Sequence, residues 1–219
     1  SILHLITAAK NASPFDVNMA IDGGFDQIIP YTNVTLSEVV GLTQDAIFSR
    51  SPSGIKRESI FIGGRDIDLA MDMLDAAEKA MFPPFKISVF ADPSGAFTTA
   101  AAMVAKVELQ LKKHFQTDFA GKKVAVFGAT GPVGGCVAVI TANLGAQAIL
   151  VGHKTVDEVR EKADSYNQRY GTEIGFADGT NDEAKQAVLN DADVVLCAAA
   201  AGIRVVTINQ ILQSKTLKI

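Results

Sequence analysis

Apolar residues along this chain alternate between short runs and longer stretches with helical spacing. In the first half, the short runs predict β-strands at 2–7, 27–31, 59–63 and 86–91. The longer stretches predict helices at 14–21, 37–48, 66–81 and 98–115. A strand–helix alternation of this kind predicts a mostly parallel sheet covered by helices.

A polar stretch from Lys112 to Lys123 then interrupts the pattern. We place a domain boundary there, with an N-terminal α/β domain at 1–116 and a second domain at 117–219. In the second half we expect strands at 124–127, 148–151, 173–176 and 194–198, and helices at 132–144, 155–169, 182–189 and 207–212.

The expected fold class is therefore α/β: two βα domains, the second a Rossmann-like doubly wound parallel sheet. Leu217, Lys218 and Ile219 resemble the opening of another strand, and the second half is short for a domain of this kind. We therefore expect this chain to be truncated at its C-terminal end.

Composition narrows the class of protein. With 219 residues, 48% hydrophobic and 20% charged, the chain is an ordinary globular protein. A net charge of −4 argues against nucleic acid or an anionic membrane as the main partner. The longest apolar stretch, 194–203, is shorter than the about 20 residues that span a bilayer. Cys136 and Cys197 lack metal-ligand spacing, so we expect two buried thiols and no metal site. We also expect a cytoplasmic location.

Three glycines with the spacing Gly-x-x-Gly-x-x-Gly follow the strand at 124–127 and open a helix. In a dinucleotide-binding turn the first glycine permits the tight turn, the second lets the pyrophosphate approach, and the third lets helix and strand pack closely. The free N–H groups of the helix N-terminus then face the phosphates. The alternative is a purely structural turn. We predict a dinucleotide site made by Gly128, Thr130, Gly131, Pro132, Val133 and Gly134.

The end of the next strand indicates which dinucleotide binds. NAD sites place an acidic residue there to bind the ribose hydroxyls, but here His153 and Lys154 occupy the place and no acid appears before Asp157. This predicts NADP, with NAD possible; a solvated lysine is the alternative. Ala198 and Ala199 after the last strand would lie beside the nicotinamide ribose, unless they only pack a strand end.

Candidate substrate residues lie in the first half. Ser13 and Pro14 predict a helix start. Phe15, Met19 and Asp22 then share a face that would frame a flat polar heterocycle; the alternative is a half-buried helix with a solvated Asp22. The segment from Asp92 to Thr99 leaves a strand and enters a helix with hydroxyls at its start. Our hypothesis is that the residues orienting the substrate are Phe15, Asp16, Asp22, Asp92, Thr98 and Thr99.

The segments SPFDVNMAIDGGFDQIIPY, LTQDAIFSR, PPFKISVFADPSGAFTTAAAMVA and DADVVLCAAAAGI resemble the NAD(P)-dependent methylene-tetrahydromethanopterin dehydrogenases of methylotrophic bacteria. The similarity runs through the whole chain. It implies a two-domain homo-oligomeric enzyme with the reduced pterin in an interdomain cleft. The implied reaction is hydride transfer from methylene-tetrahydromethanopterin to NADP or NAD, giving methenyl-tetrahydromethanopterin in formaldehyde oxidation and one-carbon metabolism.

No residue is assigned as an acid or base. The carbon between two pterin nitrogens can lose hydride directly, because the nitrogen lone pairs stabilise the resulting cation, so no proton has to move. Two alternatives stay open at this point. One is a methylene-tetrahydrofolate or other small-substrate NADP dehydrogenase, and the other is a non-catalytic NADP-sensing protein.

Overall fold

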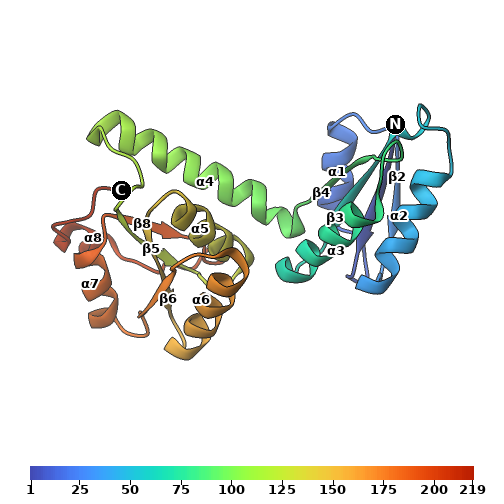
Figure 1. The fold of residues 1–219 in the computed structure, drawn as a ribbon. Coiled ribbons are helices and arrows are strands. Elements are labelled where there is room, and N and C mark those ends of the chain that lie inside the picture. Colours follow the sequence, from blue (N-terminus) through green and yellow to red (C-terminus); the bar gives the residue numbers. More distant parts are fainter. The chain divides into compact units, whose positions relative to one another are not determined.

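The computed structural model describes all residues from 1 to 219 and divides them into two compact units, Ser1–Gly95 and Ala96–Ile219. Each unit contains one four-stranded sheet with helices packed on it (Figure 1). No helix is both long and apolar enough to cross a membrane.

In the first unit the strand order is β2-β1-β3-β4, and every neighbouring pair is parallel. The strands are β1 (Ile2–Thr7), β2 (Gln27–Tyr31), β3 (Glu58–Gly63) and β4 (Ser88–Ala91). The helices are α1 (Pro14–Asp22), α2 (Val39–Phe48) and α3 (Ile67–Ala80), with 3-10 turns at Leu36–Glu38, Ile55–Arg57 and Pro93–Gly95.

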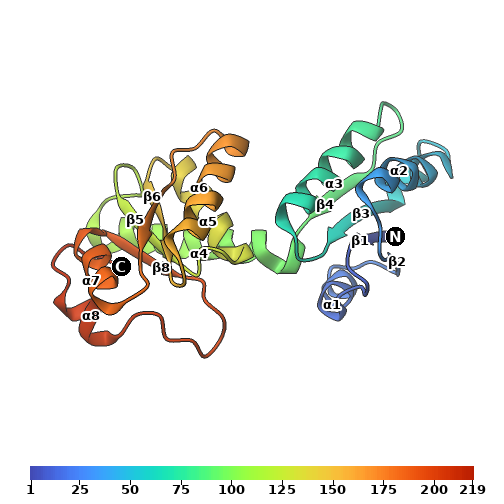
Figure 2. The same cartoon turned by 90° about the horizontal axis from the view of Figure 1, so that it is seen from below.

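Helices cover the two faces of this sheet unequally. Figure 2 shows α2 and α3 on one face and α1 on the other. The face that α2 and α3 cover is packed with apolar side chains such as Ile47 and Met73, both at most 1% exposed. Helix α1 buries only Asp16 and Ala20. A carboxyl group thus belongs to the small patch through which α1 packs.

In the second unit the strand order is β7-β6-β5-β8, again all parallel. The strands are β5 (Lys123–Phe127), β6 (Gln147–Gly152), β7 (Gly175–Asp178) and β8 (Val194–Cys197). The helices are α4 (Ala96–Gln110), continued by a π-helical turn at Leu111–Phe115, then α5 (Pro132–Asn143), α6 (Val156–Tyr170), α7 (Asp182–Asp191) and α8 (Ile208–Gln213).

Alternate residues of β5 point into two separate cores. Val124 and Val126 pack with residues of α4, α5 and α6, such as Val104 and Val137. On the opposite face, Ala125 and Phe127 pack with Leu189 and Ala192 at the end of α7. Because both faces of the strand are buried, its side chains are apolar throughout the run Val124–Phe127.

The α/β class and the two parallel sheets predicted from the sequence are confirmed. Strand β7 begins two residues later than predicted, at Gly175. The reason is a side chain: the amide of Asn167 accepts a hydrogen bond from the N–H of Ile174 (2.7 Å) and donates one to its carbonyl oxygen (2.9 Å). Ile174 therefore pairs with α6 and stays outside the sheet ladder.

Helix α4 packs with the second unit, whereas the domain boundary predicted from the sequence places it in the first domain, 1–116. Ala100 and Val104 of this helix belong to the core that contains β5. Both divisions leave the same strands in the same half. At the other end, the N–H of Val195 in β8 donates to the carbonyl oxygen of Ile219 (2.8 Å), although 217–219 form no strand.

Candidate functional site

The turn from β5 into α5 depends on two glycines. Gly128 has φ +74°, a left-handed conformation that side chains rarely adopt, and a Cβ there would lie 2.5 Å from the carbonyl carbon of Ala198. A Cβ at Gly134 would lie 2.4 Å from the carbonyl oxygen of Gly128. The first and third glycines of the motif therefore have the roles expected of them, the tight turn and the close helix packing.

Gly131 differs from its two neighbours. Its backbone is extended, with φ −80° and ψ 161°, and a Cβ would meet only the carbonyl oxygen of Gly128, at 3.3 Å. It is the N-cap residue of α5, no side chain caps that helix, and Pro132 is the first helical residue. The first turn of α5, which includes Val133, thus keeps free N–H groups that can bind a phosphate. Thr130, half-buried, precedes this turn.

The end of β6 carries no acidic residue. A Cβ at Gly152, the last residue of the strand, would lie 2.5 Å from the carbonyl oxygen of Thr155, so the turn leaves no room for a side chain there. His153 and Lys154 follow, both exposed, and Lys154 forms no ion pair. This arrangement suits an added phosphate better than the two hydroxyls of an NAD ribose.

Ala198 and Ala199 lie directly against the glycine loop. The N–H of Ala198 donates to the carbonyl oxygen of Phe127 (2.8 Å), and the backbone N of Ala199 lies 2.6 Å from the position of a Cβ on Gly128. The loops after β5 and β8 therefore meet at the carboxyl edge of the sheet. Open parallel sheets bind ligands at such an edge.

The first unit has a polar centre at the carboxyl edge of its own sheet. Asp16 in α1 and Asp92 after β4 are each 7% exposed. Burial, and then the negative charge of Asp92, raise the pKa of the Asp16 carboxyl above its ordinary value. The N–H of Asp92 donates a hydrogen bond to the carbonyl oxygen of Ile62 (3.1 Å), and this bond holds Asp92 beside the end of β3.

Other predicted substrate residues lie on exposed surface. Phe15 is 60% exposed, and Asp22 is exposed on the same side of α1, away from the buried Asp16. Thr98 and Thr99 are exposed in the first turn of α4, which belongs to the second unit. The structure therefore brings Asp16 and Asp92 together in one unit and leaves the other four at the surface.

Sequence reasoning missed Gly63 and Gly152. A Cβ on Gly63, the last residue of β3, would lie 2.7 Å from Oδ2 of Asp16, so the absence of a side chain makes room for the carboxyl. The signal was present, because a Gly-Gly pair directly after an apolar run marks the end of a strand. The partner that needs the space lies 47 positions earlier in the chain, beyond the reach of local patterns.

Two parallel βα units, one with a glycine-rich turn into a helix, place the chain in the Rossmann-like class of α/β proteins, in which such a turn binds dinucleotides. Comparison with known proteins narrows this class. Residues 14–94 match the family model for the N-terminal part of methylene-tetrahydromethanopterin dehydrogenase. The chain is 53% identical over 207 residues to the NAD(P)-dependent methylenetetrahydromethanopterin dehydrogenase of Methylorubrum extorquens, spanning 94% of this chain and 70% of the relative. The chain belongs to the methylene-tetrahydromethanopterin dehydrogenase family.

A second relative from the same organism, the bifunctional protein MdtA, is 34% identical over 191 residues, which is 87% of this chain and 65% of that protein. Among solved structures, the aspartate transcarbamoylase of Trypanosoma cruzi aligns with all of this chain and 69% of its own, with a TM-score of 0.49 and 12% identity. That likeness has no bearing on function.

Proposed function

We propose that this chain is an oxidoreductase that transfers a hydride from methylene-tetrahydromethanopterin to NADP, or with lower preference to NAD, in one-carbon metabolism. The observation that carries the proposal is the geometry of the Gly128–Gly134 turn in a chain of this family. It leaves the N-terminus of α5 uncapped and Gly131 uncrowded, as a bound pyrophosphate requires.

The candidate cofactor residues have separate roles. The turn, with Thr130, Pro132 and Val133, binds the pyrophosphate, and His153 with Lys154 binds the 2′-phosphate. Ala198 and Ala199 form a flat backbone surface for the nicotinamide ribose. When bound, NADP supplies the acceptor carbon for the hydride.

On the substrate side, the methylene C–H bond breaks with its electron pair leaving on the hydride, and a cationic methenyl group remains. No proton is transferred, so the protein needs to orient the reactants within about 3–3.5 Å and to stabilise the positive charge. We assign these tasks to Asp16 and Asp92, with Phe15, Asp22, Thr98 and Thr99 as further contacts of the substrate.

Two properties of the whole protein are proposed with this activity. We propose a cytoplasmic location, supported by two cysteines that form no disulfide. We also propose a homo-oligomer, which light scattering on the purified protein tests directly.

The activity is tested by mixing the purified protein with methylene-tetrahydromethanopterin or methylene-tetrahydrofolate, each with NADP or NAD, and following the absorbance of the reduced nicotinamide. We expect the fastest turnover with methylene-tetrahydromethanopterin and NADP. Faster turnover with the folate would reassign the substrate. Tight NADPH binding without turnover of either pterin would instead support a non-catalytic sensor.

A further inference from the structure

Two of the three buried carboxyls in the first unit, those of Glu58 and Asp16, have opposite surroundings. Glu58, 4% exposed, forms an ion pair with Nε of Arg50 (2.6 Å) and lies 3.2 Å from Nε2 of His4. Asp16, 7% exposed, has no hydrogen-bond donor and no cation against its carboxyl group. Buried carboxyls in folded proteins are nearly always paired, so an unpaired one indicates a group that the protein binds.

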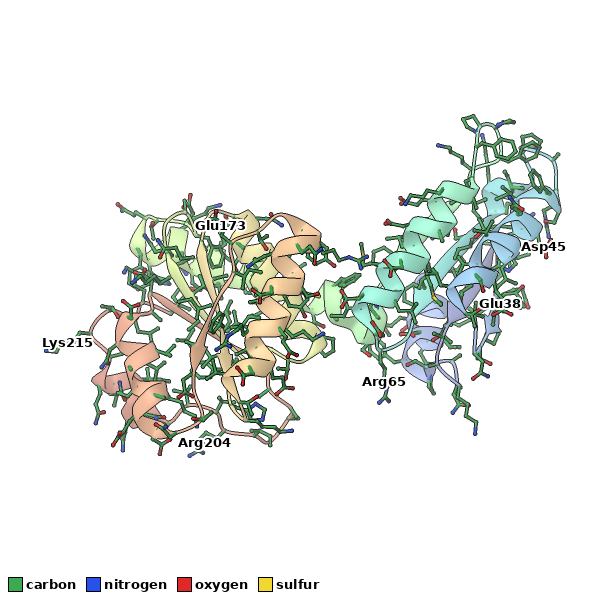
Figure 3. All side chains as sticks on the ribbon, turned by 60° about the horizontal axis from the view of Figure 1, so that its bottom comes forward. Glu38, Asp45, Arg65, Glu173, Arg204 and Lys215 are labelled. Atoms are coloured by element: carbon green, nitrogen blue, oxygen red, sulfur yellow. The ribbon has the colours of Figure 1, made fainter.

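The carboxyl of Asp16 is not sealed inside the unit. No oxygen of Asp16 is among the buried side-chain atoms that are closed to water and make no hydrogen bond. The oxygens of Asp16 therefore keep access from outside. Figure 3 labels Arg65 on the loop just after β3, and this exposed side chain forms no ion pair with Asp16.

The surrounding backbone is arranged to keep this space open. Gly63 leaves room for Oδ2 of Asp16, and Gly64 has φ +128°, which side chains rarely adopt. Ser94 is held in the left-handed region, with φ 56°, and its hydroxyl donates to the carbonyl oxygen of Gly64 (3.0 Å). Strained backbone of this kind is retained mainly at functional sites.

We propose that Asp16 is the residue that recognises the pterin ring, by accepting two parallel hydrogen bonds from the amino-pyrimidinone edge. This inference rests on the proposed function. On that edge a ring N–H and the neighbouring exocyclic amino group point in the same direction, at a spacing that matches the two oxygens of one carboxylate. Paired hydrogen bonds to a charged group are strong and directional. Binding supplies the donors that Asp16 lacks.

Asp92 acts on this interaction as a positioning residue. Its negative charge raises the pKa of the Asp16 carboxyl, and hydrogen bonds from substrate N–H groups would favour the ionised form. Asp92 is the only charged group that acts on Asp16 in this way. Lys10 and Arg65 on the neighbouring loops are exposed, and neither shifts the pKa of the Asp16 carboxyl.

The test compares Asp16→Asn with Asp45→Asn, a matched change at an exposed carboxyl on α2 of the same unit. For Asp16→Asn we expect KM for the methylene-pterin to rise about 10- to 100-fold, the range given by the loss of hydrogen bonds to a charged group. We expect KM for NADP to stay within about twofold, and the melting temperature to stay equal or rise. Asp45→Asn should leave all three unchanged.

Two further measurements separate recognition from a structural role. A methylene-pterin that lacks the exocyclic amino group should bind poorly to the wild type, with a much smaller further loss in Asp16→Asn. Asp92→Asn should shift the acid limb of the pH profile of kcat/KM to lower pH, because Asp16 then ionises more easily. If Asp16→Asn leaves KM for the pterin unchanged while the wild type turns it over, the inference is wrong. If the wild type turns over no pterin, the proposed function fails first.

Discussion

Replacing Gly131 by alanine should separate the binding of NADP from the stability of the fold. In the free protein the added methyl meets only the carbonyl oxygen of Gly128, at 3.3 Å, and the extended backbone at φ −80° suits alanine. The small crowding is offset by about 0.4–1 kcal/mol from the stiffer unfolded chain. We therefore expect the free energy of unfolding to change by less than about 1 kcal/mol.

Binding of NADP should suffer far more from the same methyl group. The second glycine is the point where backbone and pyrophosphate meet, and losing one charge-assisted hydrogen bond costs about 1.5–3 kcal/mol. At 1.4 kcal/mol per factor of ten, Kd for NADPH should rise about 10- to 100-fold. Calorimetric titration measures Kd, and urea denaturation measures stability.

Gly134→Ala is the matched control for this prediction. Its methyl would lie 2.4 Å from the carbonyl oxygen of Gly128 and 2.9 Å from Cα of Ala129, both backbone atoms. It should therefore destabilise the free protein by about 1–3 kcal/mol. An unchanged Kd for NADPH in Gly131→Ala would refute the assignment of this turn to the pyrophosphate.

Three further predictions follow from the geometry. Lys154→Glu should raise KM for NADP much more than KM for NAD, in steady-state kinetics; equal effects on both would refute the 2′-phosphate assignment. Because the pKa of Asp16 is raised in the folded state, the folded state binds more protons than the unfolded state between the ordinary and the raised pKa, and stability falls as pH rises through this window. Urea denaturation across this range should show a fall in the free energy of unfolding that Asp16→Asn lacks. Identical pH profiles for the two proteins would contradict this prediction. Asn167→Ala removes both hydrogen bonds to Ile174 and should destabilise the protein by about 1–3 kcal/mol in urea denaturation, while an unchanged midpoint would show that this contact does not hold β7.

Most of the fold is predictable from the sequence because its strands and helices have strong local patterns. The run Val124–Phe127 is apolar on both faces, as a central parallel strand must be, and the glycines after it mark the turn. The start of β7 is not predictable in this way. It depends on Asn167, which captures the backbone of Ile174 from a neighbouring helix.

In the candidate site, too, some features are predictable from the sequence and others depend on packing. Periodicity groups Phe15, Met19 and Asp22 on one face of α1, and the structure leaves that face exposed. The sequence offers Asp16 only as one of six candidate substrate residues, an acid in the first turn of a short helix. Its burial arises only from packing, because its carboxyl lies beside Gly63, where the absence of a side chain leaves room for it.

The sequence by itself determined the two βα halves, the glycine turn with its uncapped helix, and the absence of an acid after β6, because each is encoded within a few adjacent residues. Only the tertiary structure decided which carboxyl is buried without a partner, that Ala198 lies against Gly128, and that α4 packs with the second unit. These properties depend on contacts between residues far apart in the chain, where burial and close approach, not local propensity, set the free energy.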